Sequence, residues 1–259
     1  MCIRDRLSAL LPDVPVCILP ETVSTNADAR ALLLRGGAHG SLVVAARQTG
    51  GRGRMGRAFC SEEGGLYMSL LLRGAWPAGQ LTTLCAVAVC RALERCGVQP
   101  GIKWTNDLVL GTKKICGILT ELTVEAESGT VDSIVAGIGV NVRQRPEDFP
   151  EELRAIAGSV YSETGLELSR ARLAAEMVRA LDEMYLDWRR DPRAYLSDYR
   201  ARCVTVGRPV RVVRGENVRT GFAEAVDDDF ALVVRWEDGT RETVTGGDVS
   251  VRGLFGYLD

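Results

Sequence analysis

Histidine is almost absent from this 259-residue chain, and the residue patterns of several common sites are missing. A single histidine, His39, leaves little basis for a Ser-His-Asp mechanism. The eight cysteines contain no CxxC pair, so we expect reduced core thiols rather than a zinc site or a disulfide framework. No apolar run approaches the roughly 20 residues of a membrane span, and no secretory signal is visible. We therefore expect a cytoplasmic protein without membrane contact.

An excess of basic residues is also missing. The 32 basic residues face 34 acidic ones, and residues 207–259 contain seven arginines against ten acidic residues. Proteins whose main partner is a nucleic acid usually carry a basic domain or face. We expect no nucleic-acid partner.

Lysine is scarce and clustered. Twenty-nine of the 32 basic residues are arginine, and the three lysines are Lys103, Lys113 and Lys114. The lysine ammonium is a compact point charge and the guanidinium a wide planar fork, so a tight oxygen site can reject the exchange. We hypothesise that segment 103–114 borders the chemical centre. The alternative is chance under biased codon usage.

The apolar patterning predicts an α/β domain followed by a small all-β unit. Strands are predicted at 17–19, 41–46, 66–72, 101–105, 115–122 and 131–142, the last two as a hairpin. Helices are predicted at 27–35, 81–96, 147–164 and 173–188. Short β-like runs then follow at 209–214, 221–225, 231–236 and 242–245, which predict a small barrel within 207–259.

The loop from Thr49 to Arg57 holds four glycines and three arginines and no acidic residue. Glycine lets a ligand approach the backbone, and arginine binds carboxylate or phosphate, often in a bidentate manner. The loop lacks the GxxxxGK[ST] pattern of a P-loop. A solvated surface loop and an RNA-contacting segment remain alternatives, but the position between two buried strands favours a flap that closes on a ligand.

Two further segments carry polar side chains in apolar surroundings. The run KWTND at 103–107 places a cation, an amide and a carboxylate at the end of a predicted strand, which suits a phosphate and its Mg²⁺. The run GIGVNV at 137–142 places Asn141 beside two glycines. A buried asparagine needs partners, which backbone groups or a ligand can supply.

Together these segments resemble the biotin protein ligases, which attach biotin to carrier domains of carboxylases. The resemblance covers nearly the whole chain. Its motifs, in order, are Ser24-Thr25-Asn26, Gln48, GRGRMGR at 51–57, KWTND at 103–107, KKICGILTE at 113–121, GIGVNV at 137–142 and GGDVSVR at 246–252. Two positions depart from the family: Thr105 stands where proline is usual, and Phe59 where tryptophan is usual.

The resemblance implies a mixed-sheet, class II synthetase-like α/β catalytic domain over residues 1–205 and a C-terminal SH3-like barrel over 206–259. Some members carry an N-terminal winged-helix domain and repress transcription. Only 23 residues precede Ser24 here, so we expect a ligase without the repressor function.

The implied reaction uses ATP to activate biotin as biotinyl-5′-AMP and then transfers biotin to a lysine of a biotin carboxyl carrier protein domain, with Mg²⁺ as the metal. The sequence does not decide whether the protein forms a homodimer. The residues implied as catalytic are Lys114, Arg54 and Lys103. Those implied to bind biotin are Ser24, Thr25, Asn26, Gln48, Arg52, Gly53, Arg54 and Lys114. Those implied to bind ATP or the adenylate are Arg52, Arg54, Arg57, Phe59, Lys103, Asn106 and Asn141, with Asp107 as the metal ligand.

Two other functions compete with this one. Lipoate or octanoate ligases share the catalytic architecture, but they typically carry an RRxSGGG segment with a nearby histidine, and this chain has neither. A non-catalytic nucleotide- or RNA-binding module could use the arginine-rich loop, but the acidic balance and the lysine cluster oppose it.

Overall fold

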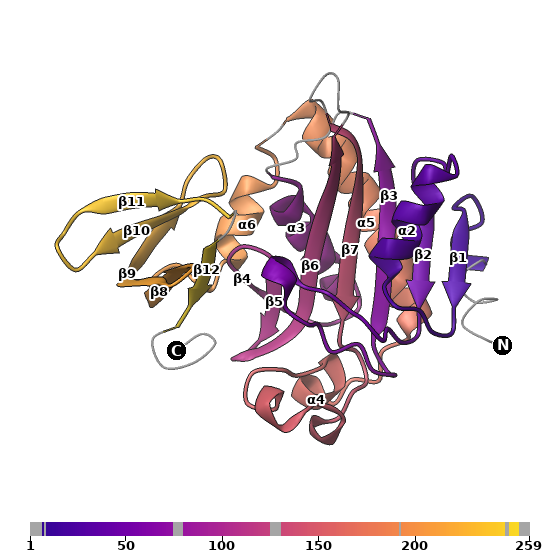
Figure 1. Ribbon diagram of the computed structural model, residues 1–259, viewed down its shortest axis with the longest axis horizontal. Coiled ribbons are helices and arrows are strands. Elements are labelled where there is room, and N and C mark those ends of the chain that lie inside the picture. Colours follow the sequence, from indigo (N-terminus) through magenta and orange to yellow (C-terminus); the bar gives the residue numbers. More distant parts are fainter. Residues whose placement is uncertain are drawn as a thin grey trace.

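The computed structural model describes residues 7, 9–74, 80–124, 131–191, 193–246 and 249–253. A mixed seven-stranded sheet flanked by helices lies beside a five-stranded antiparallel sheet formed by the C-terminal part of the chain (Figure 1). Residues 247 and 248 of the GGDVSVR motif and residues 254–259 of the predicted barrel lie outside the described residues. The predicted α/β class with a second, smaller β unit is confirmed.

The large sheet has the order β1-β2-β3-β7-β6-β5-β4. The pair β1–β2 is parallel and the other pairs are antiparallel, which makes the sheet mixed. Its strands are β1 (Val16–Leu19), β2 (Leu42–Ala45), β3 (Leu66–Arg73), β4 (Gly101–Lys103), β5 (Asp107–Leu110), β6 (Lys113–Val124) and β7 (Val131–Val140). The predicted strands and the β6–β7 hairpin are confirmed. The four residues of β5 were not predicted, because the turn-like Asn106-Asp107 pair lies at the start of the strand.

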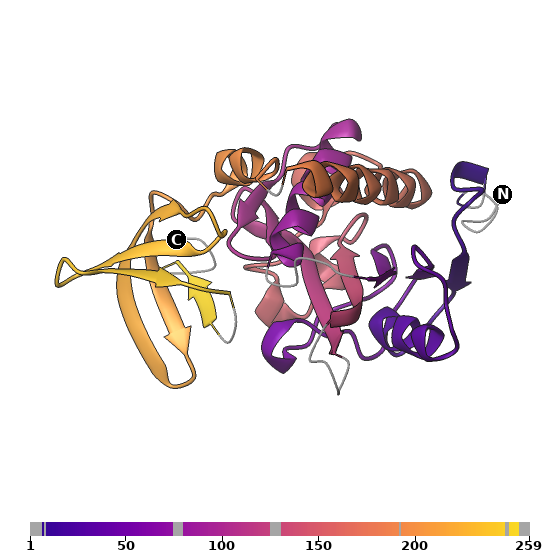
Figure 2. The ribbon, with the colours of Figure 1, turned by 90° about the horizontal axis from the view of Figure 1, so that it is seen from above.

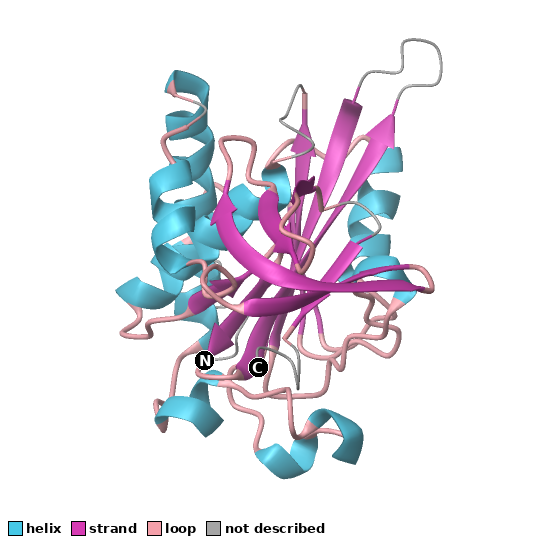
Figure 3. Ribbon diagram, turned by 90° about the vertical axis from the view of Figure 1, so that its left-hand side faces the viewer, coloured by secondary structure: helices cyan, strands magenta, loops and turns pink. Residues whose placement is uncertain are grey.

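Helices cover both faces of this sheet (Figures 2 and 3). Helices α3 (Leu81–Arg95) and α5 (Arg170–Arg190) pack on one face and form the main core with the strands. Helix α2 (Thr25–Leu34) packs on the other face through Ala29 and Leu33, against residues of β2, β3 and β7. The helices predicted at 27–35, 81–96 and 173–188 are confirmed. Helix α6 (Leu196–Arg202), which leads to the C-terminal sheet, was not predicted.

The predicted helix over 147–164 is wrong. The chain forms two single-turn 3₁₀ helices, η2 (Pro146–Asp148) and η3 (Glu151–Leu153), and the short helix α4 (Val160–Thr164). Proline has no N–H to donate, so Pro146 and Pro150 favour helix starts and interrupt a continuous helix. Part of the segment also pairs with the start of β6 rather than with itself.

The C-terminal sheet is fully antiparallel, with the order β11-β10-β9-β8-β12. Its strands are β8 (Pro209–Arg214), β9 (Asn217–Val226), β10 (Leu232–Trp236), β11 (Arg241–Val244) and β12 (Val249–Arg252). The four predicted β runs are confirmed, and β12 adds a fifth strand. The domain boundary proposed at residues 205 and 206 lies between α6 and β8.

Buried polar contacts hold the turn between β4 and β5 against the C-terminal part of the chain. The Trp104 backbone N–H donates to Thr205 Oγ1 at 2.9 Å, and its indole N–H donates to the Phe230 carbonyl at 2.9 Å. The Tyr199 hydroxyl donates to the Thr105 carbonyl at 3.2 Å. Although Thr105 replaces the proline usual in the family, its backbone is held in place.

The expectation of core thiols is met in part: five of the described cysteines are buried, whereas Cys60 is half-buried and Cys17 is exposed. Those described are free, and burial raises the pKa of the Cys85 thiol to about 12 and that of Cys116 well above its usual range. Burial also raises the pKa of Cys60. None of the described helices combines the length and apolar character that crossing a membrane requires.

Replacing Tyr199 with phenylalanine should lower the free energy of unfolding by about 1 kcal/mol, because the buried Thr105 carbonyl loses its donor. Urea unfolding measures this change, with Tyr161→Phe at a half-buried position on α4 as the control. Equal stability of Tyr199→Phe and the wild type would show that this contact does not hold the turn.

Candidate active site

A cavity of about 470 Å³ opens on the α2 face of the large sheet. The start of α2, the glycine–arginine loop, the start of β6 and the segment 149–157 form its walls, and the C-terminal sheet adds Arg211 and Val251. The structure brings every predicted site residue to this cavity: Ser24, Thr25, Asn26, Gln48, Arg52, Gly53, Arg54, Arg57, Phe59, Lys103, Asn106, Asp107, Lys114 and Asn141.

Glycines form the floor where β6 and β7 pair. Leu119 lies opposite Gly137, and Gly117 lies opposite Gly139. A Cβ atom on Gly137 would lie 2.1 Å from Asn26 Oδ1, and one on Gly139 would lie 2.5 Å from Phe59 Cε1. The floor therefore needs glycine for Asn26 and the Phe59 ring to lie directly on the sheet.

A chain of polar side chains closes the α2 end of the cavity. Gln48 Oε1 accepts from the Thr25 backbone N–H at 2.8 Å, and Gln48 Nε2 donates to Ser61 Oγ at 2.9 Å. The buried Ser69 hydroxyl donates to Asn26 Oδ1 at 2.6 Å. These bonds hold the Gln48 and Asn26 amides in one orientation each.

Glu121 and Ser24 complete this end. Asn26 Nδ2 donates to Glu121 Oε2 at 2.7 Å, and Arg30 donates to the other carboxylate oxygen of Glu121. Ser24 holds the N-cap position of α2, yet within the described chain its hydroxyl makes no capping bond to the helix. Ser24 lines the cavity, and its hydroxyl is not used for the capping bond that a serine at this position normally makes.

A β-bulge directs Lys114 into the cavity. Leu108 pairs with Cys116 and Val109 with Lys114, so Ile115 is an extra residue on β6. Side chains alternate between the faces of a strand, and one inserted residue reverses that alternation. Lys114 therefore lies on the same face as Gly117, while Ile115 and Cys116 are buried in the core.

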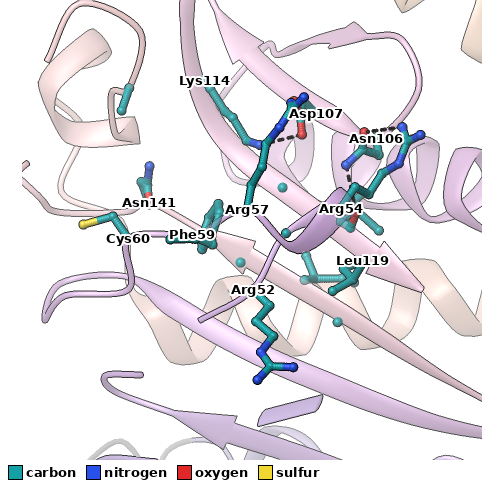
Figure 4. Close-up of a pocket in the computed structure, with 18 of the residues that line it drawn as sticks. Arg52, Arg54, Arg57, Phe59, Cys60, Asn106, Asp107, Lys114, Leu119 and Asn141 are labelled. Carbon is teal, nitrogen blue, oxygen red and sulfur yellow. Dashed lines mark hydrogen bonds and ion pairs between the residues drawn. The ribbon is translucent and has the colours of Figure 1, made fainter. Parts of the chain in front are cut away.

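Lys114 pairs with Asp107 across this face. Its Nζ lies 2.6 Å from Asp107 Oδ1 and 5.5 Å from the centre of the Phe59 ring (Figure 4). The Lys114 side chain keeps 25% of its exposure, and that of Asp107 keeps 13%. The ammonium is thus largely withdrawn from water and lies beside an aromatic ring.

The glycine–arginine loop folds into a tight hairpin over the cavity. Gly53 N–H donates to the Arg57 carbonyl at 2.8 Å, and Phe59 N–H donates to the Gly51 carbonyl at 3.0 Å. Arg54 ties the hairpin to its surroundings: Nη1 donates to Asn106 Oδ1 at 3.2 Å, and Nη2 donates to the carbonyl of Gly246, which follows β11 in the C-terminal part of the chain. One guanidinium thereby connects the loop, the β4–β5 turn and the C-terminal unit.

The remaining cations differ in direction. Arg57 extends toward Lys114 and Asp107, whereas the Arg52 guanidinium points away from them (Figure 4). Lys103, on β4, is buried and lines the cavity. The lysine cluster thus divides: Lys103 and Lys114 border the cavity, and Lys113 is absent from its wall.

Asn141 lies at the other end of the floor. Its Nδ2 donates to the Gly158 carbonyl at 2.9 Å, which fixes the amide orientation. The Oδ1 atom is buried and, within the described part of the chain, accepts no hydrogen bond. Because a buried acceptor normally has a partner, this atom is suited to a donor group of a ligand.

Asp107 is the one carboxylate among the described residues that line the cavity. The described chain holds no cluster of three or more metal-ligating side chains. Mg²⁺ is commonly bound by one or two carboxylates together with substrate phosphates and water. The donor set therefore fits a magnesium ion that arrives with a phosphate substrate, rather than one held by the protein alone.

Sequence reasoning missed the supporting residues Ser61, Ser69 and Glu121, and the apolar wall of Phe149, Leu153, Ile156 and Ala157. Glu121 ends the KKICGILTE motif and could have been noticed there. Ser69 sits in an apolar strand, where a lone serine is a weak signal. The wall lies in the segment that was wrongly predicted as one helix.

Comparison with known proteins agrees with this site. The family model described as "Biotin/lipoate A/B protein ligase family" matches residues 20–141, and "Biotin protein ligase C terminal domain" matches residues 205–252. The bifunctional ligase/repressor BirA of Bacillus subtilis is 37% identical over 227 residues, which cover 85% of this chain and 69% of that protein.

Two further relatives match over most of both chains. A biotin–[acetyl-CoA-carboxylase] ligase of Paracoccus denitrificans is 34% identical, with 90% of this chain and 98% of that protein covered. The biotin protein ligase of Aquifex aeolicus, solved in complex with biotin and ATP, superposes with a TM-score of 0.80 at 28% identity, covering 92% of this chain and 99% of that one. The chain therefore belongs to the biotin protein ligase family.

Proposed function

We propose that this chain is a biotin–[acetyl-CoA-carboxylase] ligase, which activates biotin with ATP and transfers it to a lysine of a carrier domain. The observation that carries the proposal is the position of the Lys114 ammonium, beside Asp107 and between the polar α2 end and the unpartnered Asn141 oxygen. The relatives named for this reaction, and the Aquifex enzyme with biotin and ATP bound, support it.

The first step joins two anions. A carboxylate oxygen of biotin attacks the α-phosphorus of ATP, a P–O bond forms, and the bond to the β-phosphate breaks to release pyrophosphate. Fixed positive charge lowers the repulsion between the reacting groups and stabilises the charge of the transition state. Lys114, Arg57 and Lys103 surround the place where this happens, and Arg54 closes it from the loop.

The second step is acyl transfer. The neutral ε-amine of the carrier lysine attacks the acyl carbon, a C–N bond forms, the C–O bond to the phosphate breaks, and AMP leaves while the amine loses its proton to solvent. Negative charge develops on the acyl oxygen. Lys114 Nζ can donate to that oxygen, which is how a preorganised donor accelerates acyl transfer.

The polar α2 end suits a cyclic urea. Asn26 Nδ2 is engaged with Glu121, and Oδ1 already accepts from Ser69, so Asn26 offers a ligand mainly its second acceptor lone pair. The Ser24 hydroxyl can donate. The urea ring of biotin has N–H donors and a carbonyl acceptor, which match these groups.

A lipoyl or octanoyl group would match them poorly. A dithiolane ring or an alkyl chain offers no comparable donor or acceptor, and each buried polar group left unpaired costs about 1–3 kcal/mol. The matched family model covers both biotin and lipoate ligases. The polar groups at the α2 end therefore favour biotin over lipoate or octanoate as the substrate.

The spacing along β6 and β7 orders the substrates. From the row of Leu119 and Gly137, four residues of strand lead to Asn141, about 13 Å at 3.3 Å per residue. With the urea ring beside Asn26 and the carboxylate at Lys114, the nucleotide lies toward Asn141. Its unpartnered Oδ1 then accepts a donor group of the adenylate.

Magnesium would enter with ATP, held by Asp107 and phosphate oxygens, and would supply charge neutralisation at the phosphates. Arg54 holds the loop against the β4–β5 turn and against Gly246, which follows β11. A closed loop excludes water and protects the mixed anhydride from hydrolysis. The Arg52 role in binding stays a prediction, as do a homodimer, the cytoplasmic location and the lack of a nucleic-acid partner.

Biotin-dependent exchange of labelled pyrophosphate into ATP tests the first step, and mass spectrometry of a carrier domain tests the second. Exchange with biotin and one added biotinyl group on the carrier support the proposal. Exchange that needs lipoate or octanoate instead would assign the second activity. If none of these acids supports exchange, the ligase activities are excluded and the non-catalytic nucleotide-binding module becomes the favoured function.

Replacing Lys114 with methionine should slow pyrophosphate exchange by about 10²–10³-fold, because the reacting anions lose their nearest cation. Lys114→Arg should also lose activity, since the planar guanidinium does not fit the space over Gly117. Full activity of Lys114→Arg, with an unchanged melting temperature, would contradict the role of a compact ammonium.

Arg54→Ala should chiefly speed the loss of biotinyl-5′-AMP, because the loop loses its bonds to Asn106 and Gly246. Single-turnover release of labelled adenylate measures the rate. If ATP binding alone weakens and the adenylate is retained normally, the assignment of the loop is wrong.

Gly137→Ala should raise the KM for biotin by about tenfold, since the added Cβ displaces Asn26. The KM for ATP should change by less than about twofold. The control is Ile134→Val on the same strand, whose side chain is buried in the core and does not line the cavity. An equal rise in both KM values would indicate general damage to the sheet instead.

A further inference from the structure

The two consecutive lysines that start β6 contact different parts of the molecule. Lys114 lies in the cavity, while the Lys113 ammonium donates to the carbonyls of Arg154 and Ala155 at 2.6 and 2.8 Å. Neighbouring side chains on a strand point to opposite faces, so the pair cannot act on one group together. The role of Lys113 is therefore distinct from that of Lys114.

The carbonyls that Lys113 contacts belong to the apolar wall of the cavity. Leu153 precedes them and Ile156 follows them, and both line the cavity together with Phe149 and Ala157. Figure 1 shows this segment below the ends of β6 and β7, next to α4. The wall lies at the Asn141 end, where the proposed function places the nucleotide.

The wall has little regular structure to hold it. Its one helix, η3, is a single 3₁₀ turn, and such short turns are weakly stable by themselves. Backbone bonds attach one end to β6: Lys114 N–H donates to the Ile156 carbonyl at 2.8 Å, and Gly158 N–H donates to the Lys114 carbonyl at 3.0 Å. The Lys113 bonds fix the two residues between that attachment and η3.

An ammonium suits this place chemically. Carbonyls at the end of a helical turn lack the donors that a longer helix would supply. A positive charge there is favoured by the backbone dipoles, and an ammonium carries three donors on one atom. It can therefore serve two successive carbonyls.

We propose that Lys113 is a positioning residue for the nucleotide, because it holds Leu153 and Ile156 in place at the adenylate end of the cavity. The proposal rests on the proposed function. One strand start then performs two tasks: Lys114 neutralises the reacting groups, and Lys113 fixes the wall beside them.

The test compares steady-state kinetics of the full chain with those of Lys113→Met. The KM for ATP should rise about tenfold and the adenylate should dissociate faster, while the KM for biotin should change by less than about twofold. Lys113→Arg, which keeps charge and donors, should restore most of the ATP affinity. The control is Arg179→Met, which removes a cation that donates to the Leu10 carbonyl, away from the cavity.

Hydrogen exchange of the ligand-free chain gives an independent readout, with faster exchange expected at 156–158 in Lys113→Met. Should that variant fail to fold, Leu153→Ala removes part of the wall without touching β6 and should raise the KM for ATP selectively. An unchanged KM for ATP in Lys113→Met, or equal rises for both substrates, would overturn the proposal. Wild-type protein without biotin-dependent exchange would instead refute the proposed function.

Discussion

The site depends on one charged pair held at a β-bulge. Without the extra residue Ile115, the alternation of β6 would place Lys114 on the core face, away from the glycine floor. The bulge brings the ammonium to 2.6 Å from Asp107 in a largely dehydrated position. A charge that is withdrawn from water interacts more strongly with an approaching anion than a solvated one does, and the ion pair with Asp107 holds the Lys114 ammonium at this position.

The same strand organises the rest of the cavity. Glu121 orients Asn26 at one end, the glycine row at Gly117 lets groups lie close to the sheet, and Lys114 stands at the other end. Along β6, the residues that would bind the polar ring of the substrate are followed by the glycine that lets groups lie close to the sheet, and then by the lysine that would neutralise the reacting anions. The C-terminal unit completes the site, because Arg211 and Val251 line the cavity and Arg54 donates from the loop to the carbonyl of Gly246, which follows β11.

Much of the fold could be predicted because its signals are local and strong. The apolar face of α3 and the β6–β7 hairpin are examples, and the motif residues converge on one cavity as expected. The bulge could not be predicted, because it depends on how β5 pairs with β6 and not on composition. The prediction of a single helix over 147–164 was wrong because prolines and pairing with β6 outweigh helix propensity there. For the same reason, the sequence did not predict the cavity wall that Lys113 contacts.

The proposed chemistry requires the Lys114 ammonium to act on the biotin carboxyl group. A crystal structure of this chain with biotinyl-5′-AMP tests it most directly, through the distance from Lys114 Nζ to the oxygens of the acyl-phosphate linkage. We expect a hydrogen bond of about 2.7–3.2 Å from Nζ to one of these oxygens. An adenylate bound with its acyl group beyond the reach of Lys114, while Lys114 contacts Asp107 alone, would contradict it.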